Sequence, residues 1–516
     1  MRSTAFFASC LAALSGFTCA ELNQSKPLLS KQVLSGTFKP PQVFKNTNLV
    51  RTTNLDKAYP RETINVVIEN IDSKPQSEYY LPFETSLIAK VGGLEVRDKQ
   101  AAAKGTFQVD VVGLDAESST EFYLIHLPQP LAPKAQQTLA ISYSLLSSLS
   151  PVPADIAQTA KQYLQYTFSA YTPSAYTTEK QRTKVKFPST DVPDFTTLPA
   201  DLNAEGKTDP QKQGSTFTYG PFNNVPAGAE QLVSVRYEYT RPVMHATVLE
   251  RDIEVSHWGG NLASEERYWL VNQGAALKNH FSRVEWQKQS YMNPPTFALK
   301  GLNLPLHPGA VDPYFTDDIG NVSTSRFRPG KKEGLLELKP RYPIFGAWKY
   351  SFRVGWNADL SSYLRKLATG ETYVLKVPFL EGPRSAEGIT YGRVNLRVIL
   401  PEGATNIKFS TTVPIVDHST SLHKTFMDTV GRSTLSLTAI NLVDEFRDRD
   451  LIVTYDYPWA AGYRKPVVIT LGVFAVFSVH WKKEDSVRDA CSIKSVKKAE
   501  RKNKCRKVML LESRSG

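Results

Sequence analysis

Cysteine is nearly absent from the body of this chain. The four cysteines are Cys10, Cys19, Cys491 and Cys505, so residues 20–481 contain none. That region forms no internal disulfide, which excludes the disulfide-stapled modules typical of small secreted proteins. A chain of 516 residues can bury a sizeable core without such cross-links.

Long hydrophobic runs are scarce as well. The mean hydropathy of −0.30 excludes a polytopic membrane protein. One run without a charged residue, Pro466–Trp481, lies near the C-terminus. As a helix it measures about 24 Å, which is less than the ~27 Å of a thin cellular bilayer. We predict a transmembrane helix over 466–481 that snorkelling lysines and arginines lengthen at both ends; a buried core helix is the alternative.

The first residues resemble a secretory signal peptide. Arg2 precedes a short apolar stretch, and Thr18, Cys19 and Ala20 supply the small residues of a cleavage site. We therefore expect a leader over 1–20 that is removed after Ala20; a buried first helix is the alternative. A cleaved leader places the body of the chain in the lumen of the secretory pathway.

The basic charge is concentrated at the C-terminus. Residues 482–516 carry twelve basic and five acidic side chains, a net charge of +7, which leaves +5 of the chain's +12 for everything else. A nucleic-acid-binding body is therefore excluded. By the positive-inside rule this tail is cytosolic, which predicts a single-pass type I protein. The tail could also bind anionic lipid or nucleic acid, but topology alone explains its charge.

Alternating apolar and polar residues predict half-buried strands along the body. Segments with this pattern are 64–68, 139–145, 233–239, 373–377, 394–400 and 451–455. Helical patterns are few, the better one over Ala154–Tyr166 and a weaker one over Ser361–Ala368. We predict a mainly β protein with minor helix: two β-sandwich-like lumenal domains, 21–241 and 242–457, followed by one C-terminal transmembrane helix.

No strong catalytic motif is present in the sequence. It has no His-Glu-x-x-His, no Gly-x-x-x-x-Gly-Lys and no Gly-x-Ser-x-Gly. His418 and His423 are five residues apart, which does not place them on one helical face. We predict no catalytic, cofactor-binding or metal-binding residue, and no cofactor.

Three weaker patterns each have a structural explanation. Asp317 and Asp318 precede Gly320 and indicate a turn, with a general acid as the alternative. The segment Ser256–Gly260 indicates a packed turn with Trp258 buried, or else a ligand-binding edge. A third pattern interleaves the carboxylates Asp444, Glu445, Asp448 and Asp450 with Arg447 and Arg449, and it indicates a solvated ion-pair network rather than a metal site.

Two sequons are possible N-glycosylation sites. They are Asn23-Gln24-Ser25 and Asn321-Val322-Ser323. Asn321 lies in a predicted turn, whereas Asn23 lies only two residues beyond the predicted cleavage site. We therefore expect Asn321 to carry a glycan if either does.

Several segments together resemble the ribophorin I family, the large type I subunits of oligosaccharyltransferase. They are Thr63–Asn70, Tyr219–Phe222, Glu254–Gly259, Gly274–Lys278, Phe281–Arg283, Asp318–Ser325, Pro340–Trp348 and Ile399–Ala404. They occur in the family's order and span residues 40–470. The apolar run departs from the family pattern, because it stops at Trp481 and a basic tail follows.

The resemblance implies a non-catalytic subunit of the complex that moves a preassembled glycan from dolichyl diphosphate to Asn in Asn-x-Ser/Thr. It implies scaffolding or presentation of acceptors in the endoplasmic-reticulum membrane. The implied partners are the other subunits, including a polytopic catalytic one, together with nascent polypeptide acceptors and membrane lipid, but not nucleic acid. A cell-surface β-sandwich receptor or adhesion protein is the alternative, although the cysteine-free body counts against it. A sandwich-bearing hydrolase lacks a nucleophile and base.

Overall fold

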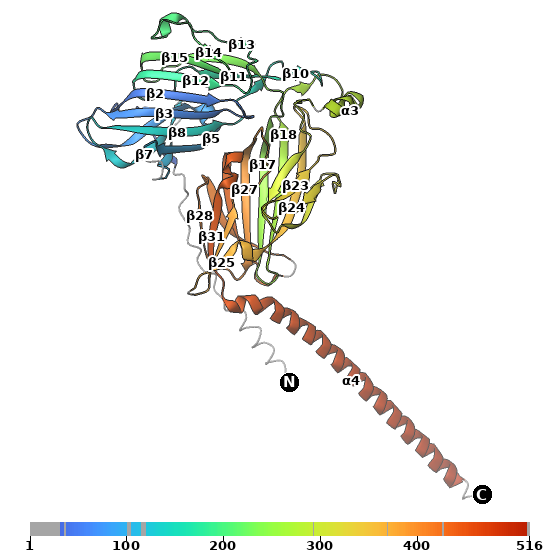
Figure 1. Ribbon diagram of the computed structural model, residues 1–516. Coiled ribbons are helices and arrows are strands. Elements are labelled where there is room, and N and C mark those ends of the chain that lie inside the picture. Colours follow the sequence, from blue (N-terminus) through green and yellow to red (C-terminus); the bar gives the residue numbers. More distant parts are fainter. Residues whose placement is uncertain are drawn as a thin grey trace.

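The computed structural model describes residues 31–35, 38–100, 105–114, 120–292, 294–368, 370–425 and 428–512 (Figure 1). The predicted leader and the sequon at Asn23 lie outside these residues. The described chain is mainly β, with one long C-terminal helix, which confirms the predicted fold class.

A mixed sheet of seven strands organises the first half of the chain. Its order is β14-β15-β12-β2-β3-β8-β5. The bounds are β2 (Phe44–Asn54), β3 (Arg61–Asn70), β5 (Val91–Asp98), β8 (Gln136–Leu145), β12 (Thr178–Lys186), β14 (Gln211–Gln213) and β15 (Thr216–Val225). Buried and partly exposed residues alternate along β2 and β3, so each strand turns one face inward, as the sequence pattern predicts.

Two four-stranded sheets cover that inner face. One is β1-β6-β7-β4, and the other is β13-β16-β11-β9. Their bounds are β1 (Lys31–Leu34), β4 (Gln76–Glu84), β6 (Gln108–Leu114), β7 (Thr120–Leu131), β9 (Ser150–Pro151), β11 (Tyr163–Ser169), β13 (Asp194–Phe195) and β16 (Leu232–Glu238). Side chains from all three sheets form one hydrophobic core, which includes Ile64, Phe122 and Tyr166.

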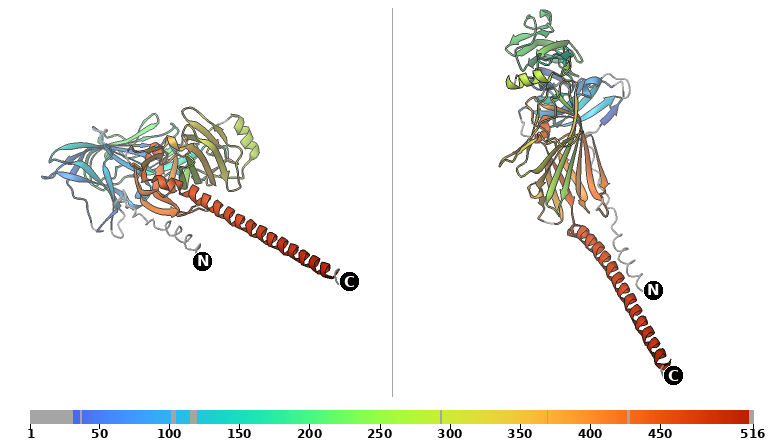
Figure 2. Two further views of the ribbon diagram at one scale, coloured as in Figure 1. Left: turned by 90° about the horizontal axis from the view of Figure 1, so that it is seen from below. Right: turned by 90° about the vertical axis from the view of Figure 1, so that its right-hand side faces the viewer.

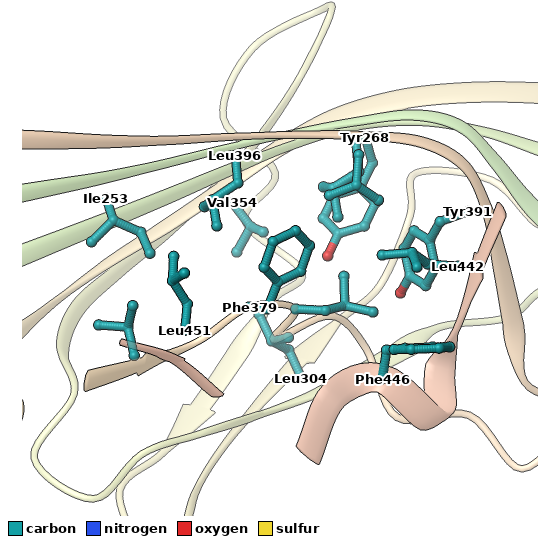
Figure 3. Close-up of a cluster of buried hydrophobic side chains, with 14 of the residues drawn as sticks. Ile253, Tyr268, Leu304, Val354, Phe379, Tyr391, Leu396, Leu442, Phe446 and Leu451 are labelled. Atoms are coloured by element: carbon teal, nitrogen blue, oxygen red, sulfur yellow. The ribbon is translucent and has the colours of Figure 1, made fainter. Parts of the chain in front are cut away.

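The second half repeats this arrangement around another seven-stranded sheet. Its order is β21-β24-β18-β17-β27-β30-β29. The bounds are β17 (Met244–Ser256), β18 (Asn261–Asn272), β21 (Val311–Asp317), β24 (Lys349–Asp359), β27 (Ile389–Glu402), β29 (Asp417–His423) and β30 (Arg432–Val443). The covering strands are β20 (Leu302–Leu306), β22 (Arg326–Arg328), β23 (Gly334–Leu338), β25 (Leu364–Lys366), β26 (Thr372–Pro378), β28 (Thr405–Thr411) and β31 (Asp450–Asp456). Figure 3 shows Leu396 and Val354 of the large sheet packed with Phe379 and Leu304.

The two large sheets share one connectivity. When the seven strands of each sheet are numbered from first to last along the chain, the two sheets have the same strand order. Each sheet contains a single parallel pair, β2–β12 in the first and β17–β27 in the second. Each opens with a strand that bulges at its fourth residue, Thr47 in β2 and Thr247 in β17. A buried arginine follows four residues later in both, Arg51 and Arg251. The chain therefore contains one β topology twice, and the predicted boundary near residue 241 falls between β16 and β17.

Both arginines are neutralised by carboxylates inside the core. The Arg51 Nε lies 2.5 Å from Glu62, which also accepts a hydrogen bond from Tyr166 Oη at 3.0 Å. Arg251 contacts Glu266, and its Nη2 lies 2.7 Å from Glu381. Such pairs cost much desolvation energy, so each requires its partners in place.

The predicted helices are the main errors at the level of elements. Ala154–Tyr166 holds β10 (Asp155–Ile156) and the start of β11, because Leu164, Tyr166 and Phe168 point alternately into the core. Ser361–Ala368 holds only the 3₁₀ turn η3 (Leu360–Ser362) and β25. The remaining short elements are α2 (Thr85–Ile88), η2 (Ala200–Leu202), β19 (Ala276–Leu277), α3 (Arg283–Met292) and η4 (Asp444–Asp448).

The C-terminal helix α4 (Trp459–Glu512) projects away from the sandwiches (Figure 1, Figure 2). Its segment Trp459–Lys482 is long and apolar enough to cross a membrane and has 24 residues. At about 1.5 Å per residue it measures about 36 Å, which covers a bilayer core without further extension. The predicted span of 466–481 lies within this segment, and its limits stay a prediction.

Candidate functional site

Metal or general acid–base chemistry has little support in the described part of the chain. Within those residues, no group of three or more His, Cys, Asp or Glu side chains could hold a metal ion. His418 and His423 lie at opposite ends of the edge strand β29, where His423 is exposed and His418 packs 5.4 Å from the Phe409 ring.

The acidic cluster 444–450 forms ion pairs, as predicted, but the network is not solvated throughout: the Asp444 side chain is only 14% exposed, and the pairs join the two halves of the chain. Asp444 accepts hydrogen bonds from Tyr59 Oη at 2.6 Å and from Lys57 Nζ at 2.9 Å. Burial and the neighbouring Asp444 raise the pKa of Tyr59. Two further pairs cross the same boundary, Arg61–Glu445 at 2.7 Å and Arg449–Glu95 at 2.5 Å.

A polar hollow of about 420 Å³ lies at this junction. Its lining includes Glu62, Arg61, Glu95, Lys186 and Arg449. Four of these five charges already form the ion pairs described above, and two of those pairs cross the boundary between the halves. The halves also pack closely at the edge of the hollow, because a Cβ on Gly92 would lie 2.1 Å from the carbonyl oxygen of Asn441.

Asp317 and Asp318 form a turn rather than an acid catalyst. Asp317 accepts hydrogen bonds from the Arg341 guanidinium at 2.5 Å and from the backbone N–H groups of Ile319 and Gly320 at 3.0 Å. Burial alone would raise the pKa of Asp317, but these hydrogen bonds outweigh it and the pKa is lowered. A carboxylate that is ionised at neutral pH has no proton to donate.

The second sequon lies directly beside this turn. Arg341 donates a hydrogen bond to the backbone carbonyl of Asn321 at 2.9 Å, while the Asn321 and Ser323 side chains are exposed. A shallow hollow of about 470 Å³, lined by residues that include Trp269, Tyr342 and Asp318, adjoins it. Exposure is what a glycan acceptor needs, and occupancy of Asn321 stays a prediction.

The Ser256–Gly260 turn differs from the prediction. His257, not Trp258, fills the aromatic niche beneath it: the His257 Nε2 lies 2.7 Å from Tyr455 Oη, and its ring centroid lies 4.5 Å from that of Tyr457. Burial lowers the pKa of His257 to about 4, so the imidazole is neutral at physiological pH. Trp258 is 80% exposed, and the predicted buried tryptophan is therefore wrong.

The start of α4 is fastened to the same end of the second sandwich. Glu371 accepts a hydrogen bond from the backbone N–H of Trp459 at 3.2 Å. Farther along, Lys465 Nζ lies 2.5 Å from Asp428, whose side chain is fully buried. Sequence reasoning missed both acceptors, since each lies far from α4 in the chain. These bonds fix the direction in which the helix leaves the body.

The fold and these contacts define a class. The chain is a mainly β protein whose paired sandwiches are held on one helix suited to crossing a membrane. The ribophorin I family model matches residues 44–482, and the chain belongs to the ribophorin I family.

Relatives agree with this assignment. Dolichyl-diphosphooligosaccharide–protein glycosyltransferase subunit 1 of Schizosaccharomyces pombe is 30% identical over 446 residues, which cover 86% of this chain and 95% of the relative. The Caenorhabditis elegans protein of the same name is 30% identical over 455 residues, covering 88% of this chain and 74% of the relative. Among solved structures, an M1 zinc metallopeptidase from Deinococcus radiodurans covers 41% of this chain and 42% of its own at 11% identity and a TM-score of 0.24, which is too low to carry an argument.

Proposed function

We propose that this chain is an accessory subunit of oligosaccharyltransferase, the complex that transfers a preassembled glycan from dolichyl diphosphate to asparagine in nascent proteins. The observation that carries the proposal is the family match over nearly the whole body, together with relatives named as subunit 1 of this glycosyltransferase. Its partners are the other subunits of that complex, in the endoplasmic-reticulum membrane. Family membership does not favour a cell-surface receptor or adhesion protein.

A scaffolding role fits the way the body is built. Ion pairs lock the first half to the second, and hydrogen bonds lock the second half to α4. A body connected in this way can hold an acceptor polypeptide or a neighbouring subunit at a fixed place above the membrane. Presentation of acceptors to the catalytic subunit is the finer role that we propose.

The topology proposed here is single-pass type I. Residues 21–241 and 242–457 would form two lumenal domains, the helix beginning at Trp459 would span the membrane, and the basic tail 482–516 would be cytosolic. The positive-inside rule supports this orientation. Neither a metal nor a cofactor is part of the proposal.

Disrupting the membrane helix tests the proposal. Val473 lies near the middle of the span, and an arginine there costs about 2.5–3.5 kcal/mol of insertion free energy. We expect Val473→Arg to reduce membrane insertion and recovery of the other subunits together, measured by carbonate extraction and co-purification in mild detergent. Val473→Leu is the matched control. Normal insertion and full recovery of the complex with Val473→Arg would contradict the proposal.

A further inference from the structure

Several loops gather where α4 leaves the second sandwich. Strand β17 runs parallel to β27, with Glu254 opposite Ile399, so the turn after Ser256 lies at the same end as the turn after Glu402. That second turn touches α4, because a Cβ on Gly403 would lie 2.8 Å from the Cβ of Ala461. The loop before β26 joins them through the bond from Trp459 to Glu371.

Exposed apolar side chains occur on loops at this end of the sandwich, as they also do elsewhere on the body. Trp258 is 80% exposed, Val430 57% and Leu367 48%. Trp459 and Tyr463, in the first turns of α4, are exposed at 73% and 61%. Isolated apolar residues on a protein surface are ordinary, but a group around the entry of an apolar helix indicates contact with a common apolar phase.

The position of Val430 along α4 follows from an ion pair. Asp428 in the same loop binds Lys465, the last charged residue before the uncharged run that begins at Pro466. Lys465 lies six residues beyond Trp459, about 9 Å farther along the helix axis at 1.5 Å per residue. The loop therefore contacts the side chain of the residue that directly precedes the apolar part of the helix.

We propose that this end of the second sandwich docks on the lipid bilayer itself, with Trp258 as an interfacial anchor and the tips at Val430 and Leu367 entering the headgroup region. Tryptophan favours the membrane–water interface, where its ring is in the apolar part and its N–H stays hydrated. The exposed Lys366 ends strand β25 directly before Leu367, and the exposed Lys424 lies in the loop that holds Val430; their charge suits lipid phosphates. This assigns a role to the His257-Trp258-Gly259 segment, in which His257 packs inward and holds Trp258 outward.

The inference rests on the proposed membrane-spanning role of α4. It adds that the body has a second attachment to the bilayer, so that the lumenal sandwiches cannot swivel about the helix. Trp258, Val430 and Leu367 contact lipid in this arrangement. An apolar surface of another subunit is the competing occupant.

Depth measurements on the full chain test the inference. All four native cysteines are replaced by serine, and one nitroxide label is attached at Val430→Cys or Leu367→Cys in the full chain in phosphatidylcholine nanodiscs. Ile319→Cys and Leu232→Cys are matched controls, exposed at 77% and 65% on other parts of the body. Accessibility to lipid-soluble oxygen relative to a water-soluble nickel chelate reports depth.

We expect lipid-like accessibility at Val430 and Leu367 and water-like accessibility at both controls. Trp258→Ala should shift the Val430 label toward water, whereas Tyr291→Ala, which removes an exposed aromatic ring from α3, should not. A label at Val473→Cys reports whether α4 is inserted. Water-like values at Val430 and Leu367 with α4 inserted would overturn the inference and leave the proposed function standing; a water-exposed Val473 would refute the proposed function itself. Labels that are accessible to oxygen in the isolated chain but inaccessible to both probes in the purified complex would assign the surface to a neighbouring subunit and overturn the inference.

Discussion

Arg251 is the residue whose removal should damage the body most. It is 1% exposed in the centre of the second large sheet, with Glu266 on the neighbouring strand and Glu381 from a covering segment 130 residues away. Arg251→Met removes the positive charge and keeps most of the side-chain volume. Two carboxylates then remain in a closed core, where Arg447 is the remaining cation that acts on Glu381.

The size of the effect follows from this burial. Removing one partner of a buried ion pair costs about 3–5 kcal/mol, because the remaining charge is uncompensated. For a domain the size of the second sandwich each kcal/mol shifts the melting temperature by about 2–4 °C, so a loss of about 3 kcal/mol lowers it by about 6–12 °C. Burial already raises the pKa of Glu381 while Arg251 opposes it, so loss of Arg251 raises that pKa further. A group with a raised folded-state pKa loses its stabilising effect as pH rises, and the variant should be weaker at pH 8 than at pH 5.

Thermal unfolding of the full chain in nanodiscs, at the two pH values, measures both effects. Arg397→Met is the matched control, since Arg397 lies on the adjacent strand and pairs with Asp252 at the surface with 48% of its side chain exposed. Exposed pairs contribute about 0–1 kcal/mol. A melting temperature for Arg251→Met equal to that of Arg397→Met would refute the reasoning about the buried network.

Three other outcomes are expected. Because the folded-state pKa of His257 is lowered to about 4 from 6.5, the folded protein resists protonation that the unfolded chain accepts. Stability should fall as pH drops from 6.5 toward 4, and His257→Gln should flatten that part of a urea-unfolding profile; an unchanged slope would contradict it. If a glycan is present, Asn321→Gln should abolish the mobility shift on glycosidase treatment, and a surviving shift would point to another asparagine such as Asn23. Reductant should leave the melting temperature unchanged, since the body between the terminal cysteines has none; a large shift would show that the cysteines are not where the topology places them.

The strand pattern was the most predictable feature of the fold. Alternation identified β3, β8, β16 and β27 because each of these strands buries one face against a covering sheet. The same criterion explains the false helix at Ala154–Tyr166, whose end enters β11, where Leu164, Tyr166 and Phe168 are buried at every second residue. Local pattern carries no information on the repeated sheet order, which depends on pairing between distant strands.

Long-range contacts also explain what was missed at the candidate sites. The apolar run places the predicted span at 466–481 because Arg464 and Lys465 interrupt it, and local pattern does not reveal that Asp428 pairs with Lys465. Trp258 was expected inside because large aromatic residues are usually buried, but the niche formed by Tyr455 and Tyr457 accepts the smaller His257 ring. Ion pairing by Asp444 was predictable from the charge pattern. The pattern does not indicate that its partners, Lys57 and Tyr59, come from the other half of the chain.

Co-purification of glycosyl transfer with the intact chain tests the central claim most directly. Affinity-tagged chain, isolated in mild detergent, should bring with it the other subunits and the transfer of a dolichyl-linked glycan to an Asn-x-Ser/Thr peptide. His257→Ala and Asp317→Ala should each leave that activity within a few-fold, whereas loss of a true general acid or base costs ~10²–10⁴-fold. A chain recovered alone, or a fully assembled complex without activity in His257→Ala, would contradict the account of an accessory subunit.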